Sequence, residues 1–191
     1  FMDGLVQRGD GEELHSVVWI SYLRASTPLA DSLPRVAYLA TLNQYFDCVA
    51  GAVLDNGGEV LKFIGDAVLA IFPIGSRDEP HSEACLQAMQ AVRQARESMD
   101  RLNQIRAAHA EPPLRFGIGL HRGDITYGNI EPSKRLDFPV IGAAVNEVYR
   151  IEGLCRALGW PVLMSPAFAE SVPSGLVSLG TQTLRGVTGQ Q

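Results

Sequence analysis

Apolar positions recur along this chain with two different periods, and these predict strands and helices in turn. An apolar run at 16–23, with β-branched and aromatic residues, predicts a buried strand. Apolar spacings of three and four predict helices at about 32–54, 79–109 and 141–158. The predicted buried stripes are, helix by helix, Leu39, Leu42, Phe46, Val49 and Val53; Cys85, Ala88, Val92, Ala95, Met99 and Leu102; and Ala144, Val148, Ile151, Cys155 and Leu158.

Further strands are expected beside tight turns. The pair Gly65-Asp66 lies between two apolar stretches, which is typical of a hairpin, and a second hairpin is predicted around 121–123. The strands predicted in this way cover 59–72 as a pair, 114–120, 124–130, 161–164 and 176–184. Their order predicts an α+β fold, a ferredoxin-like (palm-type) mixed sheet with helices packed mainly on one face.

Composition indicates one globular domain after a polar, Gly-rich lead-in at 1–15. The 191 residues are 46% hydrophobic and 19% charged, which is enough for a single core. A net charge of -5 argues against nucleic-acid binding and against membrane contact by this domain. Three dispersed cysteines, with no metal-binding spacing, predict a reducing, cytoplasmic setting. Because the first residue is not Met, we expect a piece of a longer protein.

The hairpin around Gly65-Asp66 carries a chemical signal. A carboxylate at the tip of a tight turn is held rigidly and suits a hard cation such as Mg²⁺. Lys62, within a stretch that reads as a buried strand, would need a polar partner such as a nucleobase or a phosphate. The alternative is that Asp66 only shapes the turn and Lys62 only extends its ammonium to water.

A second signal lies on the helix at 141–158. At about 100° per residue, Asn146 and Arg150 fall opposite the apolar stripe, one turn apart. Such a pair is either a solvated helix face or a clamp on a phosphate or a ribose.

Four segments together resemble the catalytic domain of class III adenylate and guanylate cyclases. They are, in the family's order, FIGDAVLAIF (63–72), FGIGLHRGDITYGNI (116–130), VIGAAVNEVYR (140–150) and LRGV (184–187). The resemblance covers about 16–188 and implies conversion of ATP or GTP to a cyclic nucleotide and pyrophosphate. It also implies that each active site is completed at a dimer interface, in a homodimer or in a heterodimer with another cyclase chain.

The same resemblance implies roles for individual residues. Asp66 would be one of two metal-binding aspartates, holding Mg²⁺ or Mn²⁺ in a two-metal reaction. Asn146 would orient the ribose and Arg150 would stabilise charge on the α-phosphate. Lys62 would contact the base, whereas Thr27 in the loop 24–27 and Arg185 would contact the triphosphate.

Two positions depart from the family. Tyr22 stands where the family has its other metal aspartate, and a neutral phenol cannot bridge two metal ions as a carboxylate does. Pro139 stands at a base-selecting position and has no hydrogen-bonding side chain, so the choice of base stays open.

Three functions therefore remain open. They are a weakened homodimeric cyclase, a catalytically degenerate nucleotide-binding module for regulation or dimerisation, and a chain that lends Asn146 and Arg150 to a different cyclase partner. A polymerase-palm enzyme is a rival from another class. It would need a second acidic residue beside Asp66 or on the first strand, and neither is present.

Overall fold

The computed structural model describes residues 11–74, 83–128, 140–172 and 175–182. A six-stranded sheet forms the centre of the chain. In chain order the elements are β1 (Gly11–Leu23), α1 (Ser26–Ser32), α2 (Arg35–Asp55), β2 (Glu59–Ile64), β3 (Ala67–Pro73), α3 (Glu83–Ala108), β4 (Phe116–Gly128), β5 (Val140–Ile141), α4 (Ala143–Leu158), β6 (Val162–Met164) and α5 (Pro166–Ala169).

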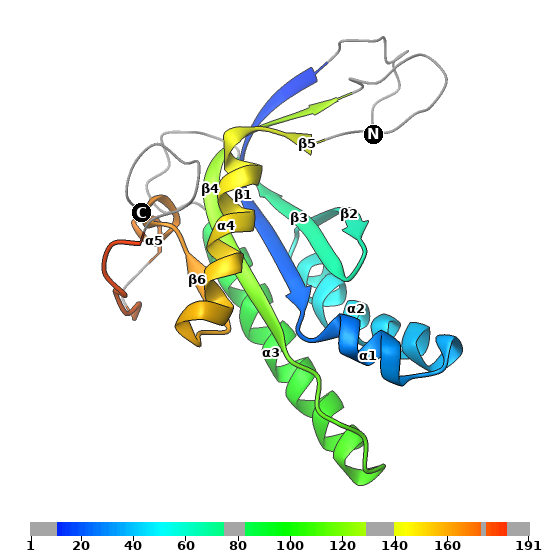
Figure 1. The fold of residues 1–191 in the computed structure, drawn as a ribbon. Coiled ribbons are helices and arrows are strands. Elements are labelled where there is room, and N and C mark those ends of the chain that lie inside the picture. The colour runs from blue at the N-terminus through cyan, green and yellow to red at the C-terminus, as the bar shows by residue number, and fades with distance from the viewer. Residues whose placement is uncertain (1–10, 75–82, 129–139, 173–174, 183–191) are drawn as a thin grey trace.

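The sheet has the order β2-β3-β1-β4-β5, with β6 also paired to β4. β1 lies at the centre and is antiparallel to both β3 and β4, whereas β6 runs parallel to β4. The mixed sheet confirms the predicted α+β fold. Two of the three long helices, α2 and α3, cover one face, and α4 covers the other (Figure 1).

Alternation along β1 explains these two layers, because successive strand side chains point to opposite faces. Val17 and Trp19 pack in the cluster that includes side chains of α2 and α3. Val18 and Ile20 pack in a second cluster with Ala144 and other side chains of α4. Because both faces of β1 are covered, its sequence is a nearly continuous apolar run instead of an apolar–polar alternation.

The second hairpin was predicted wrongly. β4 is one continuous strand through residues 121–123, and it pairs with β1 along its whole length. The polar side chains that suggested a turn are used inside the structure instead. His121 hydrogen-bonds Ser165, with 2.9 Å between Nδ1 and Oγ, and Arg122 donates to Ser171 over 2.6 Å.

Other boundaries also differ from prediction. The helix predicted at about 32–54 is α2, and α1 lies in the stretch before it that was expected to be a loop. The buried face of α2 is turned relative to prediction, so that Leu39 is 46% exposed while Tyr45 is fully buried. The described residues 175–182 contain no strand. The buried stripes of α3 and α4 agree with prediction, except that Leu102 and Leu158 are only partly buried. No helix within the described residues has the length and hydropathy needed to cross a bilayer.

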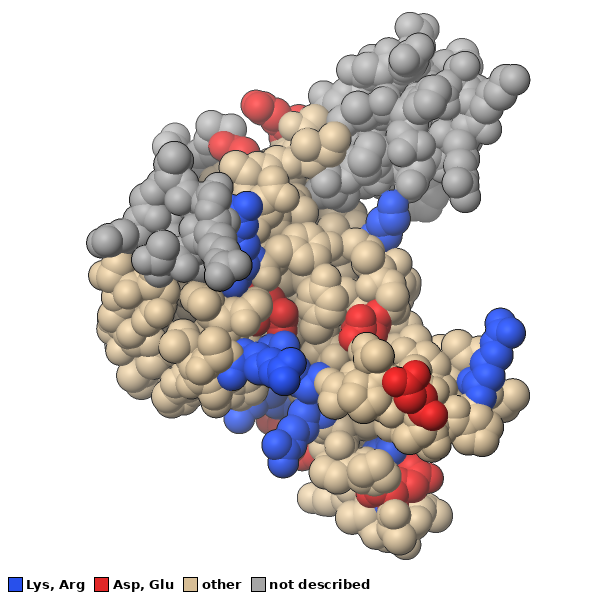
Figure 2. All heavy atoms as spheres, in the orientation of Figure 1, with Lys and Arg blue, Asp and Glu red and all other residues tan. Residues whose placement is uncertain are grey.

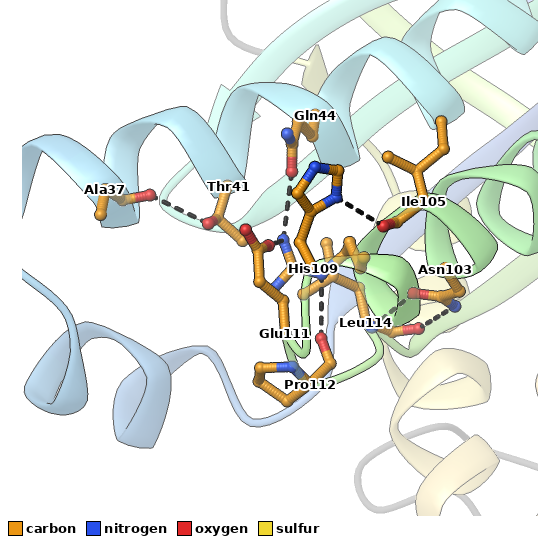
Figure 3. A network of polar contacts seen from close by, with 10 residues as sticks. Ala37, Thr41, Gln44, Asn103, Ile105, His109, Glu111, Pro112 and Leu114 are labelled. Carbon is orange, nitrogen blue, oxygen red and sulfur yellow. Dashed lines mark hydrogen bonds and ion pairs between the residues drawn. The ribbon is translucent and has the colours of Figure 1, made fainter.

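A buried arginine of α3 joins α2 to the segment between α3 and β4. Its partners Gln44, Glu111 and Pro112 are labelled in Figure 3. Arg106 is 3% exposed and donates from Nε to the carbonyl oxygen of Pro112 over 2.9 Å. Its Nη1 donates to Oε1 of Gln44 over 3.2 Å and lies 2.9 Å from Oε2 of Glu111. The charge is thus both paired and hydrogen-bonded, which a buried guanidinium requires.

Candidate active site

The β2–β3 turn brings a carboxylate to the end of the central strand. Gly65 has φ 61°, a left-handed conformation that glycine adopts without strain, and Asp66 follows it. Tyr22 of β1 pairs with Ala67 of β3, so Asp66 lies beside the position of Tyr22. The Ser26 hydroxyl donates to Asp66 over 2.5 Å, which connects the turn to the first residue of α1.

Tyr22 is half-buried beneath α4. Its ring meets the ring of Tyr149 edge to face, with centroids 6.2 Å apart. Burial, together with the nearby Tyr149, Glu152 and Asp66, raises the pKa of Tyr22 to about 12. The phenol is therefore neutral at neutral pH and offers no negative charge beside Asp66.

A buried ion pair connects the loop after β1 to α4. Arg24 lies 2.6 Å from Glu152, whose side chain is only 5% exposed. Burial raises the pKa of Glu152 although the charge of Arg24 opposes that shift. Gly117 makes room for the pair, because a Cβ there would overlap both charged groups.

The two polar residues predicted on α4 lie where the sequence placed them. The helix buries Val148 and Ile151 against the sheet, whereas Asn146 is exposed and Arg150 is half-buried. Within the described residues, no hydrogen bond or ion pair joins either side chain to Asp66. Within one chain, therefore, the carboxylate of Asp66 makes no contact with the side chains of Asn146 and Arg150.

The remaining predicted site residues are only partly described. Thr27 is exposed in the first turn of α1. Lys62 is exposed on β2, an edge strand, so its predicted burial was wrong. Arg185 and Pro139 lie outside the described residues. The roles of all these residues stay predictions.

No family model matches the chain, but individual relatives do. An adenylate cyclase of Anabaena cylindrica is 30% identical over 154 residues, which cover 78% of this chain and 29% of that protein. The crystal structure of the guanylyl cyclase Cya2 is 26% identical, with a TM-score of 0.79, and the match covers 94% of this chain and 90% of that one. The chain belongs to the class III nucleotidyl cyclase family.

The adenylyl cyclase CyaB from P. aeruginosa has the same fold as this cyclase domain. Its TM-score is 0.82 at 24% identity, and the match covers 95% of this chain and 92% of that one. The cyclase domain spans less than a third of the curated relative from Anabaena cylindrica, and 21% of an adenylate cyclase of Rhizobium meliloti that is 30% identical.

The side chains around Asp66 of this cyclase domain fit a single metal ion better than a pair of metal ions bridged by two carboxylates. Within the described residues, no three His, Cys, Asp or Glu side chains gather to form a metal site. Asp66 is the carboxylate available at the β2–β3 turn, because Glu152 faces Arg24. An ion here would complete its oxygen ligands from the nucleotide's phosphates and water.

Three features of the cyclase domain were missed from sequence. Glu152 lies on the buried side of α4, between Val148 and Cys155, and a carboxylate in an apolar stripe signals a partner. Gly117 and Gly119 alternate on β4, which signals a close approach by another element. A Cβ at Gly119 would crowd the backbone of α4. The contact between Ser26 and Asp66 left no such signal.

Proposed function

We propose that this domain binds a nucleoside triphosphate at a dimer interface and cyclises it slowly. The observation that carries the proposal is the separation of the two half-sites within one chain. Asp66 is held beside the loop after β1, while Asn146 and Arg150 project from α4 without contacting it. In a two-fold dimer, each turn carboxylate can meet the Asn–Arg pair of the other chain.

The reaction would be an in-line displacement on the α-phosphorus. The ribose 3′-oxygen forms a bond to phosphorus, its proton passes to solvent, and the bond to the leaving pyrophosphate breaks. Asn146 would hold the ribose, and Arg150 would neutralise charge that develops on the α-phosphate. A bound Mg²⁺ or Mn²⁺ supplies further charge neutralisation.

The remaining substrate contacts rest on the roles that the family resemblance gives to the other predicted residues. Thr27 and backbone N–H groups of the loop after β1 would bind the triphosphate, with Arg185 as a further phosphate contact. Lys62 would contact the base from the edge strand. Either ATP or GTP is compatible with these contacts.

We expect turnover to be slow because Tyr22 replaces the second metal-binding carboxylate. Metal ions contribute several kcal/mol to such reactions, so loss of one bridging carboxylate should lower the rate by about 10²- to 10³-fold. The phenol cannot replace the carboxylate, because its pKa of about 12 keeps it neutral.

The deciding experiment compares the unchanged chain with Tyr22→Asp and with Tyr22→Phe as the matched control. Cyclic product would be measured with ATP or GTP and with Mg²⁺ or Mn²⁺. We expect slow turnover that rises at least about tenfold in Tyr22→Asp and is unchanged in Tyr22→Phe. No product from any variant, at saturating nucleotide and metal, would refute cyclase activity of the homodimer.

A second candidate function is a nucleotide-binding module without turnover. The packing of Tyr22 against Tyr149 favours it, because the aromatic pair occupies the position expected to hold a metal ligand. This function predicts nucleotide binding without product in every variant. Product that forms only after mixing with a second cyclase chain, and is lost in Arg150→Ala, would instead identify a heterodimer partner.

A further inference from the structure

Two hydrogen bonds hold Asp66 against the segment that follows β1. The backbone N–H of Leu23 donates to the backbone carbonyl oxygen of Asp66 over 3.2 Å, which fixes the main chain of the β2–β3 turn. The Ser26 hydroxyl donates to Oδ2 of Asp66 over 2.5 Å, which fixes the side chain. Within the described residues, no other side chain hydrogen-bonds this carboxylate. The orientation of the carboxylate therefore depends on Ser26.

The position of Ser26 is itself fixed by its neighbours. The backbone N–H of Arg24 donates to the carbonyl oxygen of Arg115 over 2.7 Å, and the guanidinium of Arg24 is paired with Glu152. Ala25 then takes a left-handed conformation, with φ 55°, and Ser26 begins α1. An alanine adopts that conformation only at a cost in energy, so the contacts on either side must maintain it. Backbone strain of this kind is found at functional sites.

The bond between Ser26 and Asp66 is partly shielded from water. Both residues are half-buried, so part of each side chain stays open to solvent. Figure 2 shows acidic side chains at the surface around α1, next to the end of β1. A hydrogen bond to an ionised carboxylate is roughly twice as strong as one between neutral groups. A bond of this strength restrains the rotation of the Asp66 side chain.

The orientation of Asp66 matters for metal binding because the second carboxylate is missing. Tyr22 stands where the family has its other metal aspartate, and the phenol brings no charge. Two carboxylates constrain an ion between them, whereas one freely rotating carboxylate loses side-chain entropy when it binds an ion. A hydroxyl that fixes the carboxylate beforehand removes that loss. Asp66 therefore depends on a positioning partner more than an aspartate of a complete pair does.

We propose that Ser26 is a positioning residue that orients Asp66 for a divalent cation. The inference rests on the proposed function, in which Asp66 binds Mg²⁺ or Mn²⁺. An ionised carboxylate has about four lone-pair sites, so it accepts the bond from Ser26 and still coordinates an ion. Hydrogen bonds that orient metal ligands contribute about 10- to 100-fold in metal affinity.

The test measures Mn²⁺ binding to the whole chain, without nucleotide, from the EPR signal of free Mn²⁺. Asp66→Asn defines the part of the binding that depends on Asp66. Ser26→Ala removes the hydroxyl, and Ser26→Thr returns a hydroxyl at the same position. The matched control is Ser32→Ala, which removes a hydroxyl at the other end of α1, where it donates to the carbonyl oxygen of Leu29 over 3.1 Å.

The largest effect is expected from removal of the Ser26 hydroxyl. Ser26→Ala should weaken the Asp66-dependent binding of Mn²⁺ about tenfold, while Ser26→Thr and Ser32→Ala should stay within about threefold of the unchanged chain. In the Asp66→Asn background, Ser26→Ala should cause no further loss, because the hydroxyl acts through that carboxylate. Circular dichroism checks that each variant is folded. A lower melting temperature of Ser26→Ala, with the same Mn²⁺ affinity, would show a role in folding alone and overturn the proposal.

Two further results would also overturn it. Tighter Mn²⁺ binding in Ser26→Ala would show that the hydroxyl competes with the ion. Binding in Ser26→Thr as weak as in Ser26→Ala would show that the loss comes from the loop and not from the hydroxyl. Both results leave cyclase activity to be decided by the Tyr22 variants.

Failure of the proposed function gives a different result. Equal Mn²⁺ binding by Asp66→Asn and by the unchanged chain would remove the metal role of Asp66, and with it both this proposal and that part of the proposed function. Loss of binding in Asp66→Asn but not in Ser26→Ala would overturn the role of Ser26 alone.

Discussion

The ion pair between Arg24 and Glu152 depends on the absence of a side chain at Gly117. A Cβ at this position would overlap both the guanidinium and the carboxylate. Gly117 is itself buried on β4, so an added methyl group has to displace one of the two charged groups. Gly117→Ala therefore forces the two charges apart while the carboxylate stays buried.

The structure sets the size of this effect. Leaving a buried charge without its partner costs about 3–5 kcal/mol. The side chain of Arg24 is 25% exposed and can turn toward water, which lowers the cost. We expect Gly117→Ala to lower the free energy of unfolding by about 2–4 kcal/mol and the melting temperature by roughly 5–15 °C.

Urea unfolding followed by circular dichroism measures the loss, with Gly153→Ala as the control. Gly153 lies in α4 with open space around it, so alanine there should stabilise the domain by about 0.5–1 kcal/mol. In an Arg24→Ala/Glu152→Ala background, Gly117→Ala should cost less than about 1 kcal/mol. An equal cost in both backgrounds would show that the strand, not the ion pair, requires glycine.

Three further predictions concern stability. Ala25 has φ 55°, so Ala25→Gly should raise the free energy of unfolding by about 0.5–1 kcal/mol, measured in urea. Burial and His15 lower the pKa of His121 to about 4, against 6.5 when unfolded. The unfolded chain thus binds this proton more tightly, and stability should fall by up to about 3 kcal/mol between pH 6.5 and 4, a dependence absent in His121→Gln. Arg106→Met should cost about 2–3 kcal/mol, and full stability in that variant would contradict its bridging role.

Strong periodicity made the helices and the first hairpin predictable. The stripe from Cys85 to Met99 fixed the orientation of α3, and the Gly65-Asp66 pair fixed the turn between β2 and β3. Both features depend on local spacing, which a sequence displays directly. The exposed position of Asn146 followed from the same reasoning.

Long-range partners could not be predicted in this way. His121 and Arg122 suggested a turn because polar residues usually interrupt a buried strand. Their partners, Ser165 and Ser171, lie more than forty positions away and become neighbours only when α5 packs beside β4. Lys62 was misjudged for the same reason, since an apolar stretch does not reveal whether its strand is central or at the edge of a sheet.

The site around Tyr22 lacks a carboxylate, and its side chains are also packed to fit a phenol ring. The ring packs on Tyr149, so an aspartate there would leave space beside that ring. The new carboxylate would also lie near Asp66 and Glu152, the acidic groups that already raise the pKa of Tyr22. Like charges disfavour ionisation of a neighbouring acid. The gain from Tyr22→Asp should therefore fall short of the full 10²- to 10³-fold deficit and should grow as pH rises, because metal binding needs the ionised carboxylate.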